Sequence, residues 1–170
     1  MEALGRAFDV VCGFAPVDME TAANTGKRVH LKNCAGVTFI VFKGAGTAGD
    51  DPVVTLQQHT AASGGSSANL AVIDHYYLKD AATLAGTEQW SLITQSVSQT
   101  ITDPGGAGTS AEHQQILAIE VSSTSLSDGY EWVSLNVADT GSNAQLGCCL
   151  YVLHDLEIQR APIKLDNPQT

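Results

Sequence analysis

The segment GAGTAG at residues 44–49 has the spacing G-x-G-x-x-G, a pattern that can bind the pyrophosphate of a dinucleotide. That chemistry needs a strand before the glycines, a helix after them and an acidic residue about 20 positions further on. An apolar, strand-like run does precede them, but the chain continues as DDP (50–52) and the β-rich VVTL (53–56). No acidic residue lies between positions 53 and 72. We therefore predict no nucleotide site, and a hairpin loop at 44–51 whose glycines supply positive φ.

The histidines and carboxylates form no recognisable catalytic or metal-binding motif. None of the five histidines belongs to H-x-x-H or H-E-x-x-H, so each is predicted to be a surface or internally satisfied residue. Asp74-His75 and Glu112-His113 are neighbours in the sequence, and in an extended chain such side chains point to opposite sides. The acidic turn at 49–52 lacks the alternating oxygen ligands of a calcium loop. We predict no catalytic residue, no cofactor and no metal.

The four cysteines are predicted to be free thiols that pack as small apolar side chains in a reducing compartment. None belongs to C-x-x-C, and Cys148 and Cys149 are adjacent on an apparent strand. Their side chains should point to opposite faces, so they cannot both ligate one tetrahedral metal. The other two are Cys12 and Cys34.

The charge balance restricts the partners of the chain. It has 170 residues, enough for one domain, with 8 basic and 18 acidic residues and a net charge of −10. Binding to a phosphate backbone needs clustered Lys and Arg, so no nucleic-acid partner is predicted. Acidic chains repel one another, so any assembly must use neutral patches. The N-terminus does not resemble a secretory signal and no apolar run is long enough to span a membrane, so we expect the protein to be made in a cytoplasm without a membrane partner.

The elements that would position these residues are short strands. VTFIVFK (37–43) is apolar on both faces, which indicates a central strand covered on both sides or by a neighbouring subunit. We predict an all-β chain, an antiparallel β-sandwich or a jelly-roll-like barrel of about 8–10 strands. The predicted strands are 7–12, 28–31, 37–43, 52–58, 70–78, 87–94, 96–102, 114–121, 130–137 and 146–153. Residues 1–26 are expected to form an N-terminal arm with the first short strand, 27–154 the β-sandwich domain and 155–170 an extended C-terminal arm.

One predicted strand carries a face of aromatic residues. In YEWVSLNV (130–137), Tyr130 and Trp132 share one face, and Val133 and Leu135 lie on the other. If the valine face fills the sandwich, the aromatic face either meets a partner or forms a second core layer under a loop. Tyr130 and Trp132 are therefore candidate interface residues.

Three segments resemble small β-rich structural proteins of tailed-bacteriophage virions. These segments are FDVVCGFAPVD (8–18), VTFIVFKGAGTAGDDPVVTLQQ (37–58) and DGYEWVSLNVADTGSNAQLGCCLYVLHDLEIQRAPIKL (128–165). The shared features are a Gly-rich turn after an apolar strand, then DGYEWV, an "LG…L" strand and a tail with Arg and Pro. Residues 59–127 match least, which is what exposed variable loops would show.

The resemblance implies a non-catalytic capsid decoration (cement) protein on the outer head shell, made in the cytoplasm of the host bacterium. It implies a homotrimer as the form of the protein and the major capsid protein as its partner. The terminal arms would reach neighbouring capsomers, which adds Arg160, Pro162 and Ile163 to the candidate interface residues. Two alternatives are another virion component, such as a tail or head–tail joining protein, and a carbohydrate-binding module that would need an exposed Trp90 or Trp132.

Overall fold

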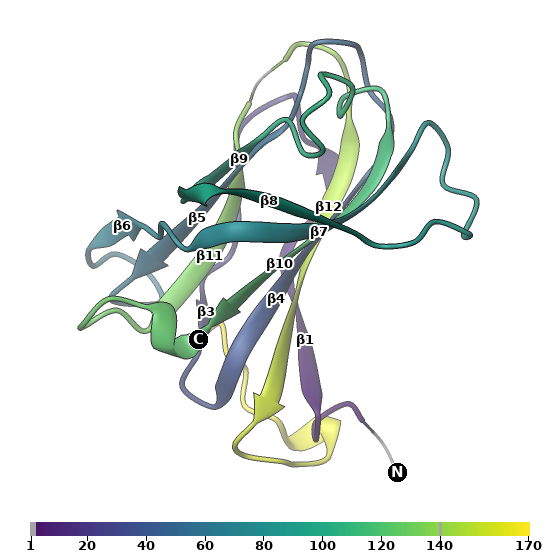
Figure 1. Ribbon diagram of the computed structural model, residues 1–170. Coiled ribbons are helices and arrows are strands. Elements are labelled where there is room, and N and C mark those ends of the chain that lie inside the picture. The colour runs from purple at the N-terminus through teal and green to yellow at the C-terminus, as the bar shows by residue number, and fades with distance from the viewer. Residues whose placement is uncertain (1–2, 140) are drawn as a thin grey trace.

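Two antiparallel β-sheets packed face to face form the molecule (Figure 1). The computed structural model describes residues 3–139 and 141–170. The long strands are β1 (Phe8–Asp18), β4 (Cys34–Lys43), β5 (Val53–His59), β7 (Ile73–Ala81), β8 (Ser91–Ser98), β10 (Gln114–Ser122), β11 (Trp132–Val137) and β12 (Leu146–Leu156). The short strands are β2 (Asn24–Thr25), β3 (Val29–His30), β6 (Ser67–Asn69) and β9 (Thr100–Thr102), and the two 3-10 turns are η1 (Ser123–Ser125) and η2 (Pro162–Lys164).

The strand order is that of a jelly roll. Sheet A has the order β1-β12-β4-β10-β7-β8, and sheet B has β2-β11-β5-β6, with β3 also on β11 and β9 also on β5. If β2 and β3 count as one interrupted strand, and β6 and β9 as another, eight strands remain besides the β7–β8 pair. In chain order these eight lie first-eighth-third-sixth in one sheet and second-seventh-fourth-fifth in the other, the arrangement of two Greek keys.

The β7–β8 hairpin is an insertion into the strand that pairs with β5. Gln57 to His59 of β5 pair with β6, and Val53 to Thr55 pair with β9 on the same side. At the junction, the Leu70 N–H donates to the Leu56 carbonyl oxygen (3.1 Å) and the Leu56 N–H donates to the Gln99 carbonyl oxygen (2.9 Å). The residues between 70 and 99 leave sheet B at this point and extend sheet A at the edge of β10.

Side chains on the inner faces of the two sheets form one apolar core. Val37, Phe39 and Val41 of β4 are buried, as are Leu56 of β5 and Tyr151 of β12. The period-2 alternation of each strand places these residues between the sheets. The predicted all-β sandwich is confirmed, and the predicted strand segments all contain strand residues. None of the described helical turns is long and apolar enough to cross a membrane.

Two local expectations need correction. Residues 44–51 do not form a hairpin loop, because they connect β4 in sheet A to β5 in sheet B. Among the glycines of this loop, Gly49 alone has a positive φ, of 88°. The first strand is also longer than predicted, because β1 pairs with β12 from Phe8 to Asp18 as an edge strand of sheet A.

The C-terminal segment folds back on its own chain. The Arg160 N–H donates to the Gly5 carbonyl oxygen (2.9 Å), and the His30 N–H donates to the Pro168 carbonyl oxygen (2.8 Å). The Gln169 side-chain amide donates to the Cys12 carbonyl oxygen (2.8 Å). These bonds tie the tail to both sheets at the β1 and β3 edges. The division of the chain into arms and a sandwich domain at 26/27 and 154/155 stays a prediction.

Candidate interaction face

The outer face of sheet A is the most distinctive surface of the molecule. Along β12, Leu150 is exposed while its neighbours Cys149 and Tyr151 are fully buried, as the strand alternation requires. The same alternation along β4 leaves Ile40 half-buried and Phe42 50% exposed on this side. Strand β4 is therefore apolar on both faces, as predicted, but one face lacks a cover within the described chain.

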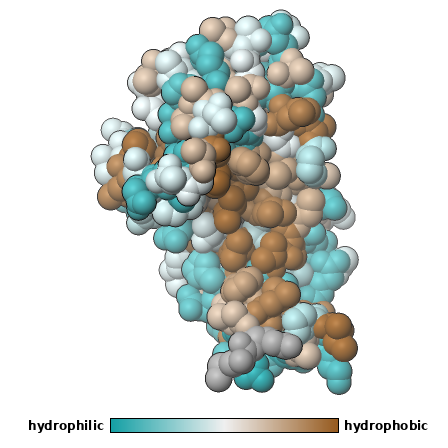
Figure 2. Space-filling model, turned by 90° about the vertical axis from the view of Figure 1, so that its right-hand side faces the viewer, coloured by the Kyte–Doolittle hydropathy of each residue, from teal (hydrophilic) through white to brown (hydrophobic). Residues whose placement is uncertain are grey.

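The apolar side chains of this face are contiguous across the strands. Register pairs join Cys12 to Leu150, Leu150 to Ile40, Ile40 to Ala118, Ala118 to Tyr77 and Tyr77 to Leu92. This row crosses all six strands of sheet A without a charged side chain. Figure 2 shows the resulting apolar band running along the molecule. We define the outer face by its exposed and half-buried side chains: Val10, Cys12, Ile40, Phe42, Tyr77, Leu92, Ile116, Leu146, Cys148, Leu150 and Val152.

Polar groups lie beside the apolar band. Lys79 pairs in register with Ile116, and its Nζ lies 5.1 Å from the centroid of the Trp90 ring. Glu120 pairs with Thr38 and is the one acidic residue of β10. Lys79 and Glu120 thus give the face one charge of each sign, and they leave the centre neutral.

The predicted aromatic strand face behaves differently from the outer face of sheet A. Trp132 is 8% exposed, and its ring stacks on the His30 ring with the centroids 4.6 Å apart. Trp132 therefore belongs to an internal layer on sheet B, which is the second of the two predicted possibilities. Tyr130 precedes β11 and is half-buried. Its role in an interface stays a prediction.

The other candidate interface residues lie at the turn η2 in the C-terminal tail. Arg160 is exposed, Pro162 is half-buried and Ile163 is 92% exposed. The Lys164 N–H donates to the Ala161 carbonyl oxygen (2.8 Å), which fixes the turn. The structure therefore brings these three residues together and holds Ile163 toward solvent, at a site separate from Tyr130 and Trp132.

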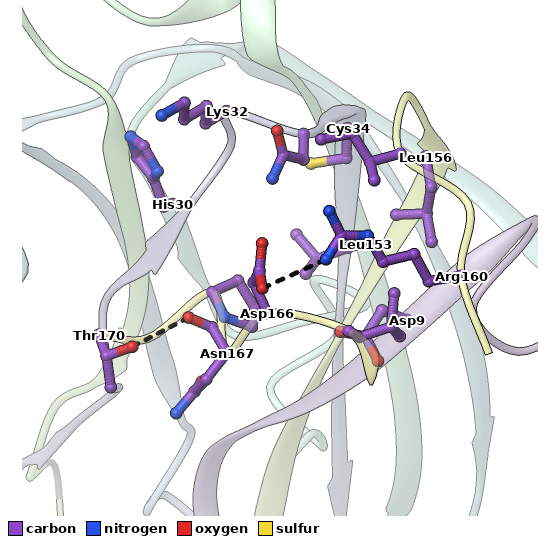
Figure 3. A pocket seen from close by; sticks show the side chains of 14 residues that line it. Asp9, His30, Lys32, Cys34, Leu153, Leu156, Arg160, Asp166, Asn167 and Thr170 are labelled. Atoms are coloured by element: carbon purple, nitrogen blue, oxygen red, sulfur yellow. Dashed lines mark hydrogen bonds and ion pairs between the residues drawn. The ribbon is translucent and has the colours of Figure 1, made fainter. Parts of the chain in front are cut away.

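A hollow of about 210 Å³ lies between this tail and the sandwich (Figure 3). Leu153, Leu156 and Cys34 line it together with Lys32 and Arg160. Arg160 faces Asp166 across the opening, with 3.7 Å between guanidinium nitrogen and carboxylate oxygen. Burial raises the pKa of the Cys34 thiol to about 11, so this cysteine is a neutral thiol in the hollow at pH 7. The hollow is smaller than usual ligand pockets.

The buried titratable groups hold loops and strands together. His59 is buried, with its ring nitrogens 2.8 Å from the Ser67 hydroxyl and 2.9 Å from the Ser134 hydroxyl. Lys43 is buried as well, and its Nζ donates to the carbonyl oxygens of His113 (2.7 Å) and Ala111 (3.4 Å). Burial lowers the pKa of Lys43 to about 8, an effect that the nearby Asp80 and Asp51 partly oppose. These contacts give both residues a structural role.

The two aspartates of the glycine loop also bind within the chain. Asp51 accepts hydrogen bonds from the Ser110 hydroxyl (2.8 Å) and the Ala111 N–H (3.0 Å). Asp50 accepts one from the Asn143 side chain (3.0 Å). No group of three His, Cys, Asp or Glu side chains within residues 3–139 and 141–170 is placed to hold a metal.

One histidine prediction is wrong in detail. Asp74 and His75 do meet, with 2.5 Å between carboxylate oxygen and Nδ1, because the irregular register between Ile73 and His75 turns Asp74 out of strand alternation. The hydrogen bond to His75 lowers the pKa of Asp74. The pair lies in solvent on an edge hairpin. The four cysteines are free thiols, and Cys148 and Cys149 point to opposite faces as predicted. Cys34 and Cys149 are buried and the other two are half-buried, and the reducing compartment stays a prediction.

Comparison with known proteins identifies no relative, because no protein-family model, curated protein or solved structure matches the chain. The fold and the site therefore define a class only, a jelly-roll β-sandwich with an apolar outer sheet face. The sequence could have pointed to this face through the apolar second faces of the strands at 37–43 and 146–153. Without the register between strands, those residues could not be joined into one surface.

Proposed function

We propose that this protein is a non-catalytic structural subunit that binds other protein subunits through the outer face of sheet A. The observation that carries the proposal is the row from Cys12 to Leu92, which is apolar and unbroken across six strands. Large contiguous apolar patches on soluble proteins mark interaction sites. Phe42 at 50% exposure and Leu150 at 42% are the side chains on which such contacts would depend.

The assembly we propose is the head shell of a tailed bacteriophage, where the protein would serve as a decoration (cement) protein. Support comes from the sequence resemblance to small virion proteins and from a fold class that is common among viral capsid proteins. The proposed partners are further copies of the chain, as a homotrimer, and the major capsid protein. Many small contacts repeated over a shell would add through multivalency and oppose internal pressure without chemistry.

The copy number of the chain in purified particles tests this function. Quantitative mass spectrometry should give a ratio of order one to the major capsid protein. A ratio of a few per cent would instead favour the alternative of a tail or head–tail joining protein, which occupies few positions. Absence from washed particles would contradict a virion role.

A carbohydrate-binding module remains as a second candidate because of Trp90. This ring is 48% exposed, with the Lys79 ammonium on one side of it, whereas Trp132 is buried. Sugar rings stack on exposed aromatic faces, so added glycans would have to change the fluorescence of Trp90. The matched variant Trp90→Phe would abolish that response, and an unchanged wild-type spectrum would exclude this candidate for the glycans tested.

A further inference from the structure

We infer that the outer face of sheet A is an interface between copies of this chain. This inference rests on the proposed function and deepens it, because it names which of the two proposed partners covers that face. Three observations carry it: the composition of the face, its size and its place in the charge distribution.

The face consists of rows of apolar side chains that cross the strands. One row runs from Cys12 to Leu92, and a neighbouring row joins Cys148 to Phe42 and Phe42 to Ile116. Val10 and Val152 pair in a third row on β1 and β12. These side chains resemble the inner face of a sandwich in type and spacing, and such faces bury themselves against a second sheet.

The size of the face suits an oligomer contact. Six strands about 4.8 Å apart span roughly 24 Å, and the residues from Leu146 to Val152 on β12 span about 20 Å. The footprint is therefore about 500 Å², and the projecting side chains add accessible area to it. Stable interfaces bury about 800 Å² of accessible surface on each partner. One sheet face of this chain thus supplies most of the required area.

Many acidic residues of the chain lie away from this face, at one end of the sandwich. Eight acidic residues lie at the end that holds the β4–β5 and β11–β12 loops, at the top of Figure 1. These residues are Asp18, Glu20, Asp50, Asp51, Asp80, Asp103, Glu112 and Asp139. Within residues 3–139 and 141–170, Lys43 is the one Lys or Arg at the same end, and it is buried. Two copies with a net charge of −10 each repel one another through such surfaces.

The outer face avoids this repulsion because its band is neutral. Lys79 and Glu120 add one positive and one negative charge, so the surface is balanced against an identical copy. A basic partner would be attracted to the acidic loops. A second copy of the chain would be repelled by them, so it can associate only through a surface that lies away from those loops. The neutral sheet face therefore fits a second copy better than a basic partner.

Sedimentation velocity of the full chain tests the inference. The expected wild-type species has a mass that is a multiple of 17.8 kDa. Phe42→Glu and Leu150→Glu each bury a carboxylate in the proposed interface, so at least a tenfold weaker association is expected. Ser63→Glu is the control, because Ser63 is exposed between β5 and β6 of sheet B and lies outside the face. Circular dichroism and thermal melting would verify that each variant is folded.

The cysteines of the chain provide a second readout. Cys12 and Cys148 are half-buried on the outer face. Their alkylation by a maleimide should be slow in the wild-type oligomer and faster in Phe42→Glu, while Ser63→Glu should label as slowly as wild type. Equal labelling rates in all three folded proteins would overturn the inference.

The outcomes separate this inference from the proposed function. A wild-type chain that stays at 17.8 kDa up to about 100 μM would overturn self-association through the face. If that monomer still bound particles, and particles protected Cys148, the proposed function would stand with the capsid protein as the occupant. An oligomer that the face variants dissociate supports the inference, and its mass then decides between the proposed trimer and a dimer.

Discussion

The hydroxyl oxygen of Tyr151 accepts a hydrogen bond from the backbone N–H of Leu135, 3.2 Å away, and so joins the two sheets through the core. Tyr151 lies on β12 of sheet A, Leu135 lies on β11 of sheet B, and both are fully buried. The Tyr151 ring also meets Phe39 edge to face, with the centroids 4.7 Å apart. Burial raises the pKa of Tyr151, so its hydroxyl stays protonated.

Tyr151→Phe should therefore cost stability although the ring remains. The Leu135 N–H would be left in the core without a partner, and a buried unsatisfied amide costs about 1–3 kcal/mol. Urea denaturation measures the free energy of unfolding. Tyr130→Phe is the control, because Tyr130 is half-buried just before β11 and should change stability by less than about 0.5 kcal/mol. Equal values for the two variants would contradict the role of the Tyr151 hydroxyl.

Gly26 makes room for this contact. A Cβ atom at Gly26 would overlap both the Leu135 carbonyl oxygen and the Tyr151 hydroxyl. Gly26→Ala should therefore destabilise the protein by about 1–3 kcal/mol or more, as overpacking of a core does. Gly44→Ala is a matched control, because the nearest atom to its Cβ would be 3.5 Å away. If thermal melting gave the same midpoint for both variants, the core would be able to accommodate a methyl group at Gly26, which would contradict the prediction.

His59 should make the fold sensitive to acid. Burial, and secondly the charge of Arg28, lower the pKa of His59 to about 4 from its usual 6.5. The unfolded chain therefore binds a proton between pH 6.5 and pH 4 that the folded chain does not, and stability falls as the pH falls through this window. Because of His59 alone, the free energy of unfolding should fall by about 2–3 kcal/mol over this pH window. Urea denaturation at pH 7, 6, 5 and 4 measures it.

A variant isolates the contribution of His59 from that of the carboxylates. His59→Gln should be less stable at pH 7 but should lose less stability between pH 6.5 and pH 4 than wild type. His75→Gln serves as the control, because its ring lies in solvent. If wild type and His59→Gln lost the same amount, another group would cause the acid sensitivity.

The sequence predicted the elements of the fold well because each strand carries its own alternation. The segments 37–43 and 114–121 are short apolar runs rich in β-branched residues, so their strands could be placed without the rest of the chain. The pairing of the strands could not be predicted from the sequence. β6 and β9 are separated by 30 residues and form one interrupted strand only because both pair with β5. The insertion of β7 and β8 is a consequence of that pairing.

The candidate site was predicted in part. The second apolar face of 37–43 indicated either a central strand covered on both sides or cover by a neighbouring subunit, and that face is open in the structure. Trp132 was ambiguous from alternation alone, because alternation gives the face of a residue but not what covers it. The ring that stacks on it belongs to His30, which is 102 positions away in the chain and meets Trp132 through the β3–β11 pairing.

The C-terminal tail provides the last test, because it is expected to act in binding more than in folding. Its contacts include the bonds from His30 to Pro168 and from Gln169 to Cys12, and its residues line the hollow together with Leu153 and Leu156. Deletion of residues 159–170 spares β12, which ends at Leu156. We expect a folded chain of lower stability that binds particles more weakly, as measured by thermal melting and by co-sedimentation with particles stripped of the protein.

A single substitution separates binding from stability in the tail. Ile163→Asp changes a side chain that is 92% exposed, so the melting temperature should stay within about 1–2 °C of wild type. If Ile163 anchors the tail on a neighbouring capsomer, co-sedimentation should fall at least tenfold for this variant. Lys164→Gln, next to it on the same turn, is the control and should bind nearly as wild type does. If Ile163→Asp bound fully but the deletion variant did not, the contact would lie in another part of the tail. If both variants bound fully, the tail would have no role in attachment.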